Sequence, residues 1–147
     1  MLGILGALAT GFVIGIQSTL SSRTGALIGD IQTGLLTNAM GGLIAGLVVL
    51  LLLCRQGVAA WRLPPAAAVM LVTSGTLGIA IITGIAFSLQ RTGVAAGLAA
   101  LIMGQLIISA VVDTTGVGGV EPIPLTTQRL LGLLVVAGGV YLLLPRK

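Results

Sequence analysis

Histidine, cysteine, acidic residues and aromatics are all scarce in this sequence. Among 147 residues there is no histidine, one cysteine (Cys54) and three acidic residues, with two phenylalanines, one tryptophan and one tyrosine. A single cysteine excludes a disulfide within the chain, and a Cys/His metal site would lack ligands. No phosphate-binding loop or hydrolase nucleophile motif occurs either. We therefore predict that the protein is not an enzyme and holds no cofactor or metal.

Charge is scarce as well. Charged residues make up 7% of the chain and hydrophobic residues 56%, and the mean hydropathy is +1.20. Soluble domains carry roughly a quarter charged residues, so this chain could not solvate a normal surface. Its basic residues are scattered, apart from the final pair, and the net charge of +4 does not indicate nucleic-acid binding. The lipid bilayer is the predicted surrounding.

Long apolar runs fill the sequence and predict an all-α fold. A membrane span needs about 20 apolar residues, and a helix satisfies every backbone group in lipid. The runs are continuous and longer than the alternating strands of about 10 residues in a barrel. We predict a single domain, residues 1–147, that is a bundle of five transmembrane helices. The spans are expected at about 2–20, 34–54, 66–89, 93–112 and 129–144.

The lysines and arginines do not select an orientation. With five spans, the termini lie on opposite faces, with three basic residues on the N-terminal face and four on the other. The three are Arg55, Arg62 and Arg129, and the four are Arg23, Arg91, Arg146 and Lys147. Orientation follows this difference, and a difference of one is too small to decide. Either other features fix one topology, or the chain inserts both ways and pairs with itself upside down.

Glycine, in contrast, is abundant, with 23 residues. Small residues let helix backbones approach closely in lipid, where no hydrophobic drive brings helices together. Of the glycine pairs with the spacing of the GxxxG motif, we expect three to serve helix packing. They are Gly11 with Gly15, Gly42 with Gly46, and Gly93 with Gly97.

Several polar side chains lie within the apolar runs. In "LIMGQLIISAVVDTTG", residues 101–116, Gln105, Ser109 and Asp113 follow at intervals of four and share one side of a helix. Gln17 lies late in the first run and Asn38 early in the second. Amides in hydrocarbon need partners, so these side chains point to another helix or to a wet cavity. We take Gln17, Asn38, Gln105 and Ser109 as candidate substrate-binding residues.

The remaining polar residues have plainer expectations. Asp113 is a candidate coupling or gating residue, with helix capping or loop bonding as the alternative. Asp30 is expected in a loop or at a helix cap, and Arg129 is expected to reach from the fifth span to the interface. The threonines of the third run are expected to bond their own backbone at i−4. They are Thr73, Thr76 and Thr83.

These features together resemble the YdcZ family of the drug/metabolite transporter (DMT) superfamily. The family pattern has a Gln late in the first span, followed by a loop with a basic residue and a glycine. Its fourth span has Gly-Gln, an apolar run, then Asp and a nearby Gly. The matching positions are Gln17, Arg23, Gly25, Gly104, Gln105, Asp113 and Gly116. The resemblance implies half of a ten-span transporter, completed as an antiparallel homodimer or as a heterodimer with a paralog.

The predicted function is therefore small-molecule transport across the bacterial inner membrane, with alternating access in an antiparallel dimer. Four aromatics are too few for a cage around an organic cation, so we expect a neutral or zwitterionic substrate. One alternative is a non-transporting membrane assembly subunit, although the short loops offer no docking surface. Another is a proton-coupled cation exporter like the small multidrug resistance proteins, although no acidic residue lies in the middle of a span.

Overall fold

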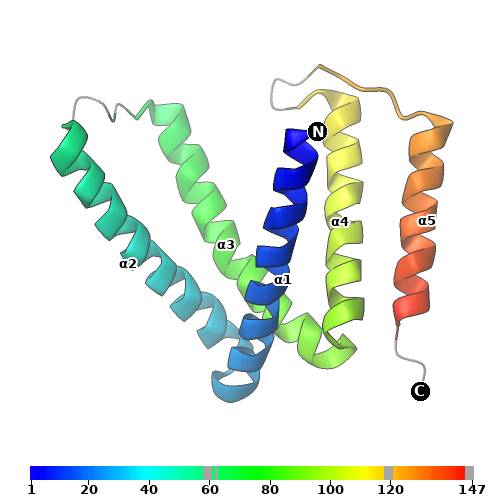
Figure 1. Ribbon diagram of the computed structural model, residues 1–147, viewed down its shortest axis with the longest axis horizontal. Helices are drawn as coiled ribbons and strands as arrows, with labels where there is room; N and C mark the ends of the chain where they lie inside the picture. Colours follow the sequence, from blue (N-terminus) through cyan, green and yellow to red (C-terminus); the bar gives the residue numbers. More distant parts are fainter. Residues whose placement is uncertain (58–60, 62, 118–120, 145–147) are drawn as a thin grey trace. The chain divides into compact units, whose positions relative to one another are not determined.

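The computed structural model describes residues 1–57, 61, 63–117 and 121–144, and these residues form five helices and no strand (Figure 1). The helices are α1 (Leu2–Ile28), α2 (Asp30–Gln56), α3 (Pro65–Thr92), α4 (Val94–Thr115) and α5 (Thr127–Leu143). The predicted all-α fold is confirmed. Arg62, Arg146 and Lys147, which entered the count of basic residues, lie outside the described residues.

The helix lengths suit a membrane. Helices α1 to α4 have 22 to 28 residues and are long and apolar enough to cross a bilayer. At about 1.5 Å per residue they measure roughly 33–42 Å, against a hydrocarbon core of about 30 Å. Helix α5, with 17 residues, is the shortest, at the lower limit for a span. Large apolar side chains are exposed along all five helices, as expected where lipid takes the place of water.

The connection between the first two helices is shorter than predicted. The sequence suggested a loop over residues 21–33, but α1 continues to Ile28 and α2 begins at Asp30, which leaves Gly29 alone between them. Gly29 has φ 96°, which glycine adopts without the steric cost of a Cβ. Its N–H donates to the Gly25 carbonyl (2.9 Å), and its own carbonyl accepts from the Thr33 N–H (3.1 Å). Gly29 therefore ends α1 and begins α2 through its own backbone hydrogen bonds.

The chain divides into two compact units, Met1–Gln90 and Arg91–Lys147, which are described separately. In the first unit, the three helices α1, α2 and α3 converge at the end that carries Gly29 (Figure 1). The core lies at this end. Its apolar members are Ile82, Ile85, Ala86 and Leu89 of α3, and its polar members are Ser18, Ser21, Ser22 and Thr33 of α1 and α2.

In the second unit, α4 and α5 lie side by side and antiparallel (Figure 1). Thr126 caps α5, because its hydroxyl oxygen accepts a hydrogen bond of 3.3 Å from the Arg129 N–H. Helix α4 ends at Thr115, and the next residue, Gly116, is in the left-handed conformation and donates its N–H to the Val112 carbonyl. The C-terminal end of α4 and the N-terminal end of α5 lie close together, since Asp113 and Arg129 are in contact there.

Candidate functional site

A cleft of about 890 Å³ opens between α2 and α3 in the first unit, with one residue of α1 at its wall. It brings together two of the predicted substrate-binding residues, Gln17 of α1 and Asn38 of α2. Apart from Thr37, the rest of its lining is apolar or glycine, including Gly42 and Ala45 on α2 and Gly75 on α3. The cleft is thus a mainly apolar space with two amides on its wall.

In this cleft the Asn38 amide nitrogen has a hydrogen-bond partner and the amide oxygen has none among the described residues. Its Nδ2 donates to the Gly34 carbonyl one turn earlier, at 2.8 Å. Its Oδ1 lies against Gly78 of α3, where a Cβ would come within 2.8 Å of it. The side chain is therefore fixed by its own helix, and its oxygen keeps a free lone pair. Gln17, by contrast, has no hydrogen-bond partner among the described residues and is exposed.

Close packing of α2 and α3 beside the cleft depends on Gly34. A Cβ at this position would collide with Thr83 Oγ1 and would lie 2.9 Å from the Ile79 carbonyl. Gly25 of α1 plays the same part toward α3, since a Cβ there would lie 2.9 Å from the Ala86 Cβ. Neither glycine belongs to a predicted packing pair. Gly25 had a signal in the sequence as the loop glycine of the family pattern, whereas nothing in the sequence singled out Gly34.

The glycines of the predicted packing pairs on α1 and α2, unlike Gly25 and Gly34, are not packed against another helix of the described chain. No atom of the described chain outside the local helix lies within 4 Å of a Cβ built at Gly11, Gly15, Gly42 or Gly46. They make no close contact within the described residues, and their packing role stays a prediction that requires another molecule. Gly93 has φ 81° and directly precedes α4, and Gly97 is buried on α4.

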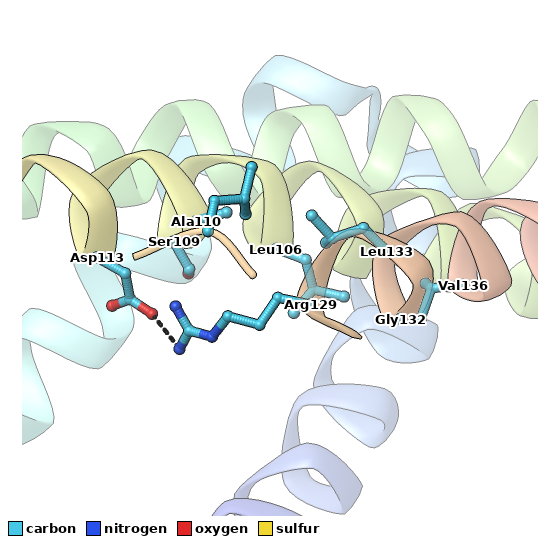
Figure 2. A pocket seen from close by; sticks show the side chains of 9 residues that line it. Leu106, Ser109, Ala110, Asp113, Arg129, Gly132, Leu133 and Val136 are labelled. Atoms are coloured by element: carbon cyan, nitrogen blue, oxygen red, sulfur yellow. Dashed lines mark hydrogen bonds and ion pairs between the residues drawn. The ribbon is translucent and has the colours of Figure 1, made fainter. Parts of the chain in front are cut away.

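A second cleft, of about 350 Å³, lies between α4 and α5 in the second unit (Figure 2). Two predicted residues line it, Ser109 and Asp113, and they face Arg129 of α5. The remaining lining is apolar or glycine: Leu106, Ala110, Leu125, Gly132, Leu133 and Val136. The polar groups gather at one end of the cleft, at the termini of the two helices, and the apolar side chains extend away from it.

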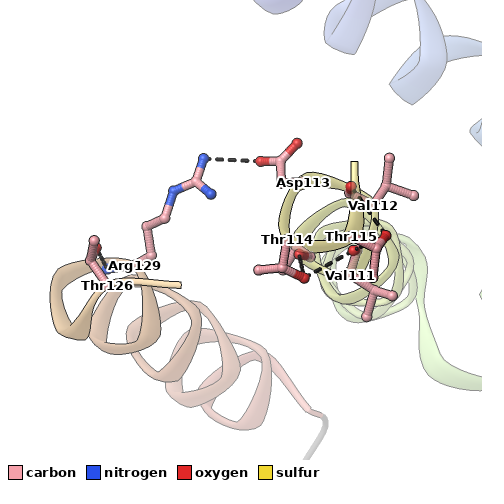
Figure 3. Close-up of polar contacts among 8 residues, drawn as sticks. Val111, Val112, Asp113, Thr114, Thr115, Thr126 and Arg129 are labelled. Atoms are coloured by element: carbon pink, nitrogen blue, oxygen red, sulfur yellow. Dashed lines mark hydrogen bonds and ion pairs between the residues drawn. The ribbon is translucent and has the colours of Figure 1, made fainter. Parts of the chain in front are cut away.

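An ion pair closes the polar end of this cleft. Arg129 Nη2 lies 2.9 Å from Asp113 Oδ2, and both side chains are part-buried, with 38% and 34% of their surface exposed (Figure 3). The backbone supports this geometry, because the Asp113 carbonyl accepts a hydrogen bond of 2.7 Å from the Ile123 N–H. Asp113 therefore bonds the following loop through its backbone carbonyl, and a coupling or gating role of its side chain stays a prediction. Arg129, expected to reach only for the interface, is its partner.

Both charges of the pair sit at the helix end that disfavours them. Asp113 lies in the last turn of α4, where the helix dipole is negative, and Arg129 lies in the first turn of α5, where it is positive. Each placement costs about 0.3–1 kcal/mol near a surface. The two unfavourable placements face each other, so each charge lies in the field of the opposite helix end as well as of the opposite side chain. This reversal is the signal that could have singled out Arg129 from the sequence.

Gln105 lies in neither cleft. It does not line the space that holds Ser109 and Asp113, and its side chain is exposed. Eight residues on a helix of 3.6 residues per turn leave a rotation of about 80° between Gln105 and Asp113, which is enough to carry the amide past the edge of the cleft. Within the described part of the chain, this amide has no hydrogen-bond partner.

Several other polar side chains have hydrogen-bond partners within the first unit. The hydroxyls of Thr73 and Thr76 donate to the carbonyls of Val69 and Val72, both at 2.9 Å, which confirms the expected i−4 bonding for these two. Thr83 makes no such bond among the described residues. Asp30, expected in a loop or at a cap, begins α2. Its carboxylate accepts from Gln90. Among the described residues, no three His, Cys, Asp or Glu side chains are grouped as metal ligands would be.

The comparisons with known proteins give one match. Residues 2–142 match the family described as "Putative inner membrane exporter, YdcZ". No curated protein and no solved structure matches the chain. The match covers nearly the whole length and agrees with the apolar helices, which are long enough for several crossings of the inner membrane.

Proposed function

We propose that this chain, which belongs to the YdcZ family of DMT-type inner membrane exporters, exports its substrate as one half of an antiparallel dimer. Two five-helix chains of opposite orientation then form an inverted pair, and the substrate binds where the two halves meet. Rocking of one half against the other exposes the site to one face at a time. The partner is a second copy of this chain or a paralog.

The observation that carries the proposal is the pair of amides without partners. Gln17 and Gln105 both lie in apolar helices, are exposed, and find no hydrogen bond within the described residues. An amide left unsatisfied in hydrocarbon is costly, and a lipid chain offers nothing to bond. A second subunit, a substrate or water in a cavity between the halves would supply the partners.

The exposed glycines support the same arrangement. The GxxxG pairs of α1 and α2 make no close contact within the described chain, although such pairs typically bring helices together in membranes. A second subunit that packs on these faces would cover them. The cleft with Gln17 and Asn38 is lined by α2 and α3 and by Gln17 of α1, and a partner beside it would complete the wall of the substrate site.

In this proposal Gln17, Asn38, Gln105 and Ser109 bind the substrate, and Asp113 acts as a gating residue. Asp113 suits gating because its ion pair with Arg129 ties the ends of α4 and α5 together at one edge of the unit. Breaking and forming that pair would let the two helices separate and close. The three acidic residues of the sequence lie at helix ends or in a loop, so a proton-coupling carboxylate at mid-membrane, as in small cation exporters, has no candidate here.

The first test measures orientation. The C-terminus is fused separately to alkaline phosphatase, active only outside the cytoplasm, and to green fluorescent protein, fluorescent only inside it. Signal from both fusions supports dual insertion and a homodimer. Signal from one fusion supports a fixed topology, and co-purification of an oppositely oriented paralog is then expected. A monomeric mass of the purified protein with neither partner would contradict the proposal.

A further inference from the structure

The cleft between α4 and α5 holds Ser109 and the Asp113–Arg129 pair of the proposed export mechanism, and its charge arrangement defines a ligand more closely than that mechanism does. At its polar end stand one carboxylate, Asp113, one guanidinium, Arg129, and one hydroxyl, Ser109 (Figure 2). A guanidinium has five N–H donors, and the ion pair uses Nη2 of Arg129 toward Asp113 Oδ2. Further donors of Arg129 therefore remain for a ligand beside the pair.

The two helix ends reinforce the charges that a ligand would need. The C-terminal end of α4 and the Asp113 carboxylate both attract a cationic group. The N-terminal end of α5 and the Arg129 guanidinium both attract an anionic group. A position that favours a cation and a position that favours an anion are thus adjacent at one end of the cleft. A protein tends to break local electrostatic preferences of this kind at functional sites.

The rest of the cleft selects an apolar body. Below the polar end, its wall consists of aliphatic side chains and glycine, such as Leu106, Leu133, Val136 and Gly132. Its volume of about 350 Å³ lies at the small end of the range for ligand pockets, about 300–1,000 Å³. A ligand that fills it has its charged groups together at one end and a short aliphatic part at the other.

We propose that the α4–α5 cleft is a binding site for a small amphipathic zwitterion, with its anionic group on Arg129 and its ammonium group on Asp113. Such a ligand replaces one internal ion pair by two, so the charged groups of protein and ligand are all matched. A lone anion or a lone cation would instead leave Asp113 or Arg129 facing a like charge or no partner, which is costly in a part-buried site. Ser109 Oγ, one turn deeper, donates a further hydrogen bond to the anionic group.

This chemistry has two sources, an aliphatic amino acid in solution or the ethanolamine headgroup of a phospholipid. The inference concerns binding and holds whether or not the chain dimerises, because every residue of the site belongs to one unit. Binding is therefore measured directly on the purified full chain in detergent, by calorimetric titration and without transport. The site shares Ser109 and Asp113 with the proposed export path, but binding to the purified chain and export from cells are measured separately, so a failure of one is distinguishable from a failure of the other.

The test compares ligands that differ by one charge. L-leucine carries both charged groups on an isobutyl body, 4-methylpentanoate lacks the ammonium, and 3-methylbutylamine lacks the carboxylate. We expect leucine to bind at least tenfold more tightly than either analogue. Dihexanoyl phosphatidylethanolamine, against dihexanoyl phosphatidylglycerol, forms the lipid arm, and a tenfold preference there assigns the site to a headgroup. No preference for the zwitterion in either arm overturns the proposal.

Variants then locate the binding. Asp113→Asn and Arg129→Gln should each weaken binding of the preferred zwitterion at least tenfold. Thr114→Val is the matched control, because the Thr114 hydroxyl donates to the Ala110 carbonyl of its own helix at 2.9 Å and lies outside the cleft lining. Binding there should be unchanged. If both charge variants keep full affinity, the ligand binds elsewhere and the assignment is wrong. The ligand series on the unaltered protein decides the matter even if a variant does not fold.

Discussion

The Asp30 carboxylate accepts a hydrogen bond of 2.6 Å from the side-chain amide of Gln90, 60 residues further along the chain. The same Gln90 nitrogen also donates to the Ala86 carbonyl of its own helix at 2.8 Å. This bond joins the first residue of α2 to the end of α3, next to the one-residue joint after α1. It therefore fastens all three helices of the first unit at the end where they converge.

We expect Asp30→Ala to lower the thermal stability of the purified protein. A hydrogen bond to a charged group contributes about 1.5–3 kcal/mol, and the exposed position of Gln90 places this bond near the lower limit. Asp30→Asn is the matched control, because it keeps an acceptor oxygen and should lose less. Thermal unfolding in detergent measures the order. Equal losses for Ala and Asn would assign the effect to the charge and not to the hydrogen bond.

Gly34→Ala should destabilise the first unit by about 1–3 kcal/mol, since the added methyl overpacks the contact between α2 and α3. It would collide with Thr83 Oγ1 and approach the Ile79 carbonyl to 2.9 Å. The double variant Gly34→Ala with Thr83→Ala should recover part of the loss, because the backbone carbonyl still obstructs. A fully stable single variant, measured by thermal unfolding, would mean that the two helices are farther apart than the structure places them.

The glycines without neighbours make the opposite prediction. Gly42→Leu and Gly46→Leu should leave the folded monomer stable, because no atom within the described chain lies near their Cβ positions. If a partner packs on this face, the same changes should raise the dimer dissociation constant at least tenfold, measured by mass photometry. Gly75→Leu on α3, which is also open but belongs to no GxxxG pair, is the comparison. Loss of folding in either paired variant would contradict the assignment to a dimer surface.

Gln105→Ala should abolish export without loss of the dimer. The substrate is identified at the same time, because the media of cells that express the protein and of cells with empty vector are compared by mass spectrometry. Compounds that accumulate outside only with the intact protein should return to vector levels with Gln105→Ala. Thr76→Ala is the control, since that hydroxyl is already bonded to Val72. If the Gln105 variant loses the dimer together with export, its amide is a structural contact.

The sequence predicts the helices better than the joints between them. Runs of apolar residues are long and continuous, and hydrocarbon admits few other folds for them, so the five helices were expected. The segment "SSRTG" looked like the end of a span, because polar residues there end the apolar run. In the structure Ser21 and Ser22 are buried and helical. Small hydroxyl side chains pack between helices as readily as they fill a loop, and hydropathy alone does not distinguish these cases.

In the candidate site, the sequence identified individual polar residues but not the residues that they contact. The amide of Asn38 and the carboxylate of Asp113 were singled out because polar groups are conspicuous in an apolar chain. Their neighbours were not, since the pairing of Asp113 with Arg129 depends on how the segment between α4 and α5 folds back. Gln105 was grouped with Ser109 by spacing, but the drift of the helix turns it away from the cleft. Spacing in the sequence gives a face of the helix, and the neighbouring helix decides how much of that face is used.

The single residue between α1 and α2 bears on how the protein enters the membrane. Each helix has 27 residues, and Gly29 bonds to both, so the turn exposes few unpaired backbone groups to be dragged through lipid. The two helices can therefore cross the bilayer together as one closed hairpin. The orientation of the whole hairpin then depends on the basic residues at its two ends. Arg23 lies near the turn, and Arg55 lies near the end of α2. Because each end carries one basic residue, the charge difference that normally sets orientation is absent from this hairpin.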